Sequence, residues 1–259
     1  MSGHALRSHL IAMALAAATL GACAGTHPKR TPAKHAQKEQ TSVWPVVERL
    51  AETRALSCFG KGEGAEYGTR IARTPVLAAP GGRFRAYAEG EALAFSEEYG
   101  PDPGCVNFSR LHLAEGARDF ELVLALSPFA GLSGNSIRIV DWSPDGERLL
   151  VETELWAYGS EFDNPDVLVL HAARRYFEAL DMAAALRQAF NRDCFLYWRA
   201  QGFLPDGAVV VETHPSGELY GPSCEERPSR WRLDERGDLG RLPAEAKIER
   251  YAREVGAAP

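Results

Sequence analysis

The chain has 259 residues, with 29 Lys and Arg against 35 Asp and Glu and a formal net charge of −6 at pH 7. An acidic balance of this size argues against nucleic acid as a partner. The length is enough for one domain with a substantial hydrophobic core.

Residues 1–22 have the pattern of a signal peptide, because Arg7 precedes an apolar run too short to span a bilayer comfortably. The run ends in Leu20-Gly21-Ala22-Cys23, which resembles the lipobox of bacterial lipoproteins, where the cysteine is acylated and becomes the first residue. The resemblance implies a lipid anchor at Cys23 and a place in the cell envelope. Ala24, in place of Asp, implies the outer membrane in bacteria with two membranes. The alternative is an ordinary signal peptide with a chance cysteine.

Residues 23–41 contain no large apolar side chain and are predicted to form a flexible tether. The tether holds four basic residues and one acidic residue, so the domain from 42–259 carries a net charge of about −10. The domain is therefore more acidic than the whole chain, and we expect no nucleic-acid partner.

Three stretches have the apolar spacing of amphipathic helices. Ser42 is placed to cap an N-terminal helix at residues 44–51, and Asp181 is placed to cap a second helix over 182–190. A C-terminal helix is predicted over 248–255. All three apolar stripes are interpreted as core packing.

A strand, a tight turn and a second strand are predicted around Pro144-Asp145-Gly146. The turn returns at Pro205-Asp206-Gly207 and, more weakly, at Pro80-Gly81-Gly82, with prolines 64 and 61 residues apart. Each copy is followed by a Tyr-Gly turn and two further predicted strands. The repeat therefore predicts three units of four antiparallel strands, A to D, at about 74–127, 136–180 and 195–243.

The segment Asp141-Trp142-Ser143-Pro144-Asp145-Gly146 resembles the Trp-Ser-Pro-Asp-Gly repeat of TolB-type, WD-repeat-like β-propellers. The resemblance implies a mainly β fold of three four-stranded antiparallel, propeller-like blades with the three helices added. The repeat is longer than the roughly 40–45 residues of such blades, and three units are fewer than the four to eight that close a ring. Whether the propeller closes is therefore left open.

Four cysteines remain after Cys23, an even number that favours disulfides in an exported chain. Cys58 and Cys194 precede strand A of the first and third units, and Cys105 and Cys224 precede strand C. The symmetry of the repeat therefore predicts the disulfides Cys58–Cys105 and Cys194–Cys224. The cysteine and histidine spacings fit no metal site, so no metal and no cofactor is expected.

Nucleophile motifs and phosphate-binding loops are not found in the sequence, so we expect no catalytic residue. The acidic residues after strand B of the second unit leave one enzymatic alternative, because paired carboxylates can hydrolyse a glycosidic bond. These residues are Glu152, Glu154, Glu161, Asp163 and Asp166. The more ordinary interpretation is a solvated acidic loop.

The loops between strands B and C should leave the same edge of each unit and are rich in aromatic and acidic residues. Our main interpretation is a non-catalytic binding or scaffold module for a protein or an envelope polymer, with Trp156, Tyr158 and Phe162 at its centre. The alternatives are a carbohydrate hydrolase and an inhibitor or immunity lipoprotein. The tyrosines could instead cap their own sheets. The candidate binding residues are Tyr99, Trp156, Tyr158, Glu161, Phe162, Asp163 and Tyr220.

Substitution of Cys23 tests the lipid anchor. Cys23→Ala removes the acylated thiol, so the protein should be released from membranes by a salt wash, whereas Thr26→Ala should stay in the membrane fraction. Immunoblotting of membrane and wash fractions measures this. Retention of Cys23→Ala in washed membranes would contradict the prediction.

Overall fold

The computed structural model describes residues 70–95, 104–127, 133–157, 164–190, 194–216, 222–234, 236–243 and 245–256. At residues 93–95, 104–105, 133 and 156–157 only the backbone is described. The predicted signal peptide, tether and N-terminal helix lie outside these ranges, as does Cys58.

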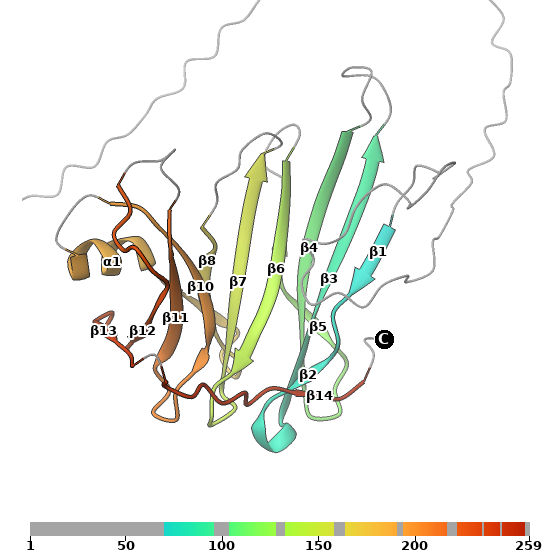
Figure 1. Ribbon diagram of the computed structural model, residues 1–259. Helices are drawn as coiled ribbons and strands as arrows, with labels where there is room; N and C mark the ends of the chain where they lie inside the picture. Colours follow the sequence, from blue (N-terminus) through green and yellow to red (C-terminus); the bar gives the residue numbers. More distant parts are fainter. Residues whose placement is uncertain are drawn as a thin grey trace, which may run out of the picture. The chain divides into compact units, whose positions relative to one another are not determined.

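The described part of the chain forms three antiparallel sheets and one α-helix (Figure 1). The first sheet has the order β14-β2-β3-β4-β5, with β1 also paired to β3; the second has the order β6-β7-β8-β9 and the third β10-β11-β12-β13. The strands are β1 (Arg70–Arg73), β2 (Leu77–Ala78), β3 (Phe84–Phe95), β4 (Gly104–Glu115), β5 (Glu121–Leu126), β6 (Ser133–Trp142), β7 (Arg148–Ala157), β8 (Asp166–His171), β9 (Tyr176–Leu180), β10 (Leu196–Phe203), β11 (Val209–Pro215), β12 (Ser229–Leu233), β13 (Leu239–Arg241) and β14 (Arg253–Glu254). The predicted fold class, mainly β with propeller-like antiparallel sheets, is confirmed.

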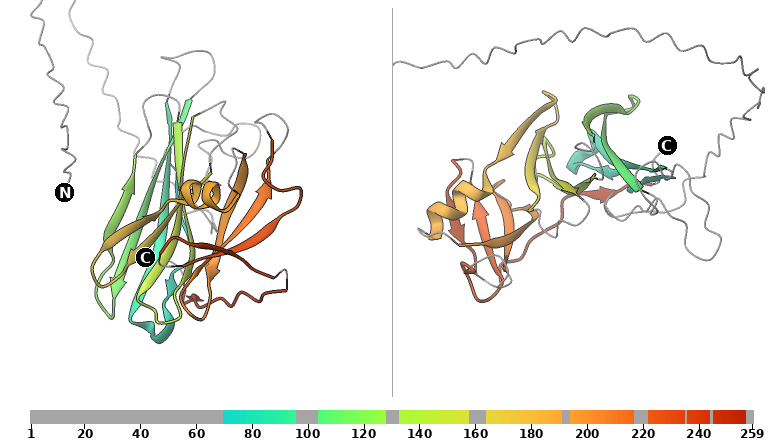
Figure 2. Two further views of the ribbon diagram at one scale, coloured as in Figure 1. Left: turned by 90° about the vertical axis from the view of Figure 1, so that its left-hand side faces the viewer. Right: turned by 90° about the horizontal axis from the view of Figure 1, so that it is seen from above.

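The second sheet lies between the other two, and both of its faces are buried (Figure 2). Consecutive residues Leu149, Leu150 and Val151 are all 0% exposed, although side chains alternate between the two faces of a strand. Leu149 and Val151 pack against the first sheet, and Leu150 packs against the third. The sheets therefore stack face to face, like consecutive blades.

The predicted Pro-Asp-Gly turn closes the first hairpin of the second sheet. Ser143 accepts a backbone hydrogen bond from Gly146 (2.9 Å), and its side chain accepts one from the N–H of Arg148 (2.9 Å). Gly146 has φ +73°, and a Cβ there would lie 2.7 Å from the carbonyl oxygen of Pro80. Glycine is required because the turn needs the left-handed region and packs against the first repeat.

The first hairpin of the third sheet repeats this geometry. Gly207 has φ +82°, and its N–H donates to the carbonyl of Leu204 (2.8 Å). A β-bulge precedes the turn in both sheets, between Ile139 and Asp141 and between Ala200 and Gly202. The two repeats thus share the irregularities of their backbones as well as their turns.

The predicted helix between the second and third units is present as α1 (Met182–Phe190). Asp181 caps it, because its carboxylate accepts a hydrogen bond from the N–H of Ala184 (2.8 Å). Met182, Ala185 and Leu186 are buried in the core between the second and third sheets. Within the part of the chain that the structure describes, no helix combines the length and hydropathy needed to cross a bilayer.

The predicted C-terminal helix at 248–255 is wrong. This segment is extended, and β14 pairs with β2 of the first sheet, Arg253 opposite Ala78 (Figure 1). The N–H groups of Tyr251 and Ala252 donate to the carboxylate of Asp141, the latter at 2.7 Å. In a helix these N–H groups would bond to carbonyl groups of the same segment. Here they bond to Asp141 instead, so the segment is extended although its apolar residues have helical spacing.

Asp141 is 0% exposed and lies on β6 in the second sheet. Burial raises the pKa of its carboxyl group, and the hydrogen bonds from the backbone N–H groups of Ala252, Trp142 and Tyr251 oppose that rise. Gly202 on β10 makes room beside it, because a Cβ there would lie 3.1 Å from the Asp141 carboxylate. One carboxylate therefore contacts the C-terminal segment and lies against the third sheet.

Removal of the Asp141 carboxylate should loosen the C-terminal segment. Asp141→Ala leaves three backbone N–H groups without their acceptor, which should lower the free energy of unfolding by about 2–4 kcal/mol. Glu178→Ala is the control, since the Glu178 side chain is about half exposed beside His171 and its loss should cost less than about 1 kcal/mol. Urea unfolding measures both, and equal midpoints for the two variants would refute the role of Asp141.

Candidate functional site

The strands that precede the predicted binding loops, β3, β7 and β11, run in the same direction, so they end at one end of the molecule (Figure 1). Trp156 lies near the end of β7, opposite Gly134, and only its backbone is described. The remaining predicted binding residues lie outside the described residues and stay predictions: Tyr99, Tyr158, Glu161, Phe162, Asp163 and Tyr220. The disulfide Cys58–Cys105 also stays a prediction, because only the backbone of Cys105 is described.

Asn164 and Pro165, which follow the predicted loop of the second sheet, are bonded to the start of β10. The Asn164 side chain donates to the carbonyl of Leu196 (3.0 Å) and accepts from the N–H of Trp198 (3.1 Å). The Trp198 indole donates to the carbonyl of Pro165 (3.0 Å). These hydrogen bonds to β10 therefore fix the position of the chain where the loop of the second sheet ends.

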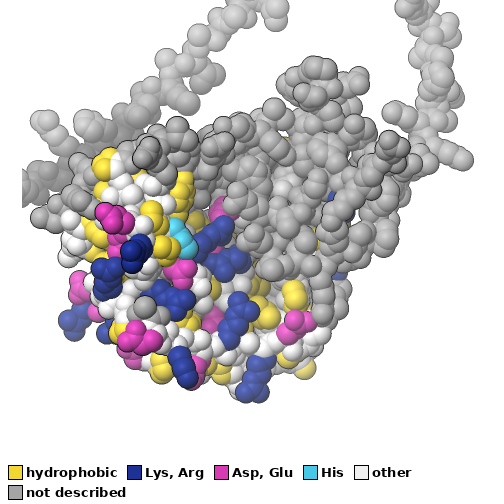
Figure 3. Space-filling view, in the orientation of Figure 1, with side chains coloured by type: hydrophobic (Ala, Val, Ile, Leu, Met, Phe, Trp, Pro, Cys, Tyr) yellow, Lys and Arg dark blue, Asp and Glu magenta, His cyan; other side chains and the backbone are white. Residues whose placement is uncertain are grey.

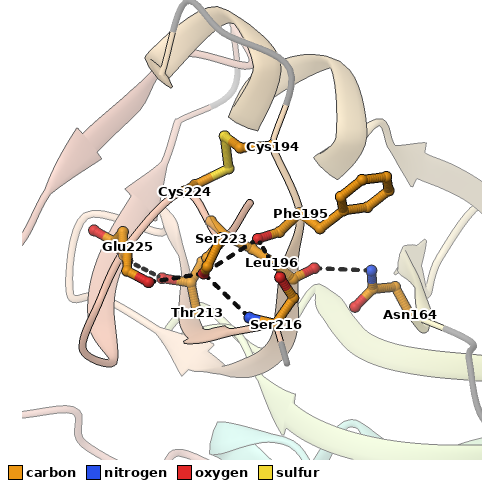
Figure 4. Close-up of a disulfide and its surroundings, with 9 residues drawn as sticks. All are labelled: Asn164, Cys194, Phe195, Leu196, Thr213, Ser216, Ser223, Cys224 and Glu225. Carbon is orange, nitrogen blue, oxygen red and sulfur yellow. Dashed lines mark hydrogen bonds between the residues drawn. A yellow bond between two sulfur atoms is a disulfide. The ribbon is translucent and has the colours of Figure 1, made fainter. Parts of the chain in front are cut away.

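The disulfide Cys194–Cys224 is present, as the repeat predicts (Figure 4). It joins the start of β10 to the segment before β12, and backbone hydrogen bonds run beside it from Phe195 to Pro222 and from Cys224 to Phe195. The side chain of Glu225 accepts a hydrogen bond from Thr213 (2.9 Å) in the same segment. A disulfide and several hydrogen bonds thus join the start of β10 to the segment before β12.

A groove of about 350 Å³ lies between this disulfide, α1 and the Asn164 anchor. Phe195 is 55% exposed at this groove, and its ring points away from the disulfide (Figure 4). The lining is mainly apolar with one guanidinium, and consists of Asn164, Ala183, Leu186, Arg187, Cys194, Phe195, Leu196, Trp198 and Cys224. The sequence carries no direct signal for this groove, because its residues come from four separate stretches of the chain: Asn164, α1, residues 194–198 and Cys224.

A buried polar cluster lies between the second and third sheets. Glu152, 1% exposed, binds the guanidinium groups of Arg138 (2.5 Å) and Arg199 (3.2 Å) and accepts a hydrogen bond from the N–H of Ala200. Arg138 in turn donates to the carbonyl of Ala200 (2.8 Å). The cluster therefore satisfies both backbone groups of Ala200 on β10, at the edge strand of the third sheet.

This cluster bears on the predicted hydrolase alternative. Arg199 lies 2.8 Å from the carboxylate of Glu154, which is 4% exposed, so both Glu152 and Glu154 are ion-paired with arginine. Asp166 is exposed on β8, and Glu161 and Asp163 lie outside the described residues. Glu152 and Glu154 are therefore engaged in ion pairs with arginine and are closed to solvent.

A second hollow, of about 570 Å³, lies below α1 between the outer strands of the second and third sheets. Its lining carries charges of both signs, including Arg148 and Asp181, and Nε2 of His171 lies 3.1 Å from the carboxylate of Glu178. His112 is remote from it, stacked on Tyr87 with 4.7 Å between ring centres, and burial lowers the pKa of its imidazole. Among the described residues, no three acidic, histidine or cysteine side chains are arranged to hold a metal ion.

No family model and no curated protein matches this chain significantly. Among solved structures, TolB from Acinetobacter baumannii aligns with 69% of this chain and 42% of its own at 16% identity, with a TM-score of 0.29. The aligned part is less than half of the TolB chain. A similarity this low carries no information about function.

Substitution of Glu152 tests the polar cluster. Glu152→Gln removes the charge that faces two guanidinium groups, which should lower the free energy of unfolding by about 3–5 kcal/mol. Glu178→Gln is the control, because the Glu178 side chain is 47% exposed and its pair should contribute less than about 1 kcal/mol. Urea unfolding checks this, and a Glu152→Gln variant as stable as Glu178→Gln would show that the cluster is dispensable.

Proposed function

We propose that the protein is a non-catalytic binding module that recognises a protein or an envelope polymer at the loop end of its sheets. The observation that carries this proposal is the apolar groove at that end, with Phe195 more than half exposed. Exposed aromatic side chains give a large contact area at a low cost in conformational entropy. The groove lies beside the anchor of the loop that carries the predicted aromatic residues.

Rigidity around the groove supports recognition. The disulfide, the Asn164 hydrogen bonds and the Trp198 indole hydrogen bond hold its walls before any partner arrives. A preformed site loses little entropy when it binds, so more of the contact energy appears as affinity. The groove is therefore suited to a rigid apolar contact surrounded by loop contacts.

The envelope location is part of the same proposal. A lipid on Cys23 and the basic tether at 23–41 would hold the domain at a membrane surface. An inhibitor or immunity role would use the loop end of the molecule, and the identity of the captured partner separates these roles.

Substitution of Phe195 tests the proposal. The full chain, immobilised and incubated with its own envelope extract, should capture a partner that Phe195→Ala loses by at least about tenfold. Tyr176→Ala is the matched control, since Tyr176 is 58% exposed on β9, away from the groove, and should capture normally. Quantitative mass spectrometry of the eluates measures the difference.

The loop residues provide the second arm of this experiment. Trp156→Ala with Phe162→Ala should also abolish capture while the melting temperature changes little. Equal capture by wild type, Phe195→Ala and the loop variant would refute the proposed site. A large loss of stability with normal capture per folded molecule would show that the loop rings belong to the core.

A further inference from the structure

The hollow of about 570 Å³ below α1 is separate from the Phe195 groove. Arg148 and Gly207 line it, so it lies beside the Pro-Asp-Gly turns, whereas the groove lies beside the loop that ends at Asn164. The helix α1 contributes different residues to each, and the two share no described lining residue. The volume of the hollow lies within the range of about 300–1,000 Å³ that is typical of small-molecule sites.

The floor of the hollow is apolar. Val169 on β8, Val209 on β11 and Leu233 on β12 line it, and they are only 3%, 5% and 3% exposed. All three belong to the core between the second and third sheets, so they lie at the bottom of the hollow. A ligand with one apolar face can therefore cover these side chains and remove apolar surface from water.

The rim of the hollow is polar and carries charges of both signs. Three carboxylates supply acceptors, and Arg148 and a second arginine supply donors, while an imidazole and an amide can do both. Besides Arg148, these half-buried or exposed side chains are His171, Glu178, Asp181, Gln188, Asp234 and Arg236. The described surface in Figure 3 likewise carries the two signs intermingled. The rim therefore offers a mixture of donors and acceptors and not a field of one sign.

Several of these polar groups are available to a ligand. Within the described ranges, the side chains of Gln188 and Arg236 make no hydrogen bond to another protein group. Asp181 uses Oδ1 of its carboxylate to cap α1. Asp234 uses its Oδ1 to accept from the N–H groups of Arg236 (2.9 Å) and Asp238 (3.0 Å). Among the described residues, each of these two carboxylates therefore keeps its Oδ2 for a further donor.

We propose that this hollow binds a short neutral saccharide built of pyranose rings. Such a ring has a face of C–H groups, which matches the apolar floor, and a perimeter of hydroxyl groups. Each hydroxyl both donates and accepts hydrogen bonds, so it matches a rim of mixed donors and acceptors. An anion would face the three carboxylates and a cation the two guanidinium groups, so a neutral ligand fits better. The hollow is distinct from the Phe195 groove, and the inference goes beyond the proposed function.

Three neutral disaccharides, maltose, cellobiose and N,N′-diacetylchitobiose, test the inference. Saturation-transfer-difference NMR with the full chain should detect binding of at least one of them, and calorimetric titration gives its Kd. Ala184→Trp places a large ring in the hollow from an exposed position on α1, and it should weaken binding at least about tenfold. Gln188→Ala with Arg236→Ala should weaken binding by a similar factor, because two polar contacts are lost. Circular dichroism confirms that the variants are folded.

Ala183→Trp is the matched control, because Ala183 is the adjacent residue of α1 but lines the Phe195 groove. It should bind the disaccharide like wild type and impair partner capture, whereas Ala184→Trp should capture the partner normally. Failure of the groove and failure of the hollow are therefore distinguishable. The inference would be overturned if none of the three disaccharides bound, or if Ala184→Trp bound with the affinity of wild type. Binding of glucuronate or glucosamine without binding of a neutral sugar would overturn it as well.

Discussion

The carboxylate of Asp141 is the contact on which the connection between the three sheets depends. It belongs to β6 of the second sheet, lies against Gly202 of the third, and holds the C-terminal segment that completes the first. A buried carboxylate without hydrogen-bond donors would cost several kcal/mol. The N–H groups of the C-terminal segment therefore stabilise the Asp141 carboxylate, and the carboxylate in turn holds that segment in place.

The stacking of the sheets decides which surfaces are available for binding. Both faces of the middle sheet are used in packing, so its charged residues, Arg138 and Glu152, become a structural cluster. Arg199 of the third sheet joins this cluster through Glu152, whereas Glu212, which matches Glu152 in the repeat, pairs with Arg230 and stays partly open to solvent. Equivalent residues of a repeat thus acquire different roles according to their place in the stack.

Local signals in the sequence were sufficient for much of the fold. Pro144-Asp145-Gly146 and its copies predict the hairpins, Asp181 and the apolar stripe predict α1, and repeat symmetry predicts Cys194–Cys224. These features depend on residues close together or on matching positions of the repeat. They could therefore be inferred without knowledge of the tertiary contacts.

Other features depend on contacts between distant residues, and the sequence pattern could not indicate them. The spacing of Ile248, Tyr251, Ala252 and Val255 is helical, but the N–H groups of Tyr251 and Ala252 are bonded to Asp141. The groove at Phe195 arises only when α1, β10 and Asn164 meet. Glu152 could be interpreted as a loop carboxylate because nothing near it in sequence indicates Arg199 as its partner.

The pairing of β14 with β2 also has a consequence for the time course of biosynthesis. Arg253 pairs with Ala78, 175 positions earlier, so the edge of the first sheet cannot be completed until the ribosome has synthesised the other two sheets and β14. Contacts this distant in sequence form slowly, because the entropy cost of closing a long loop comes before any favourable contact energy. The first sheet of the nascent chain therefore keeps an unpaired edge at β2 while the second and third sheets are being synthesised.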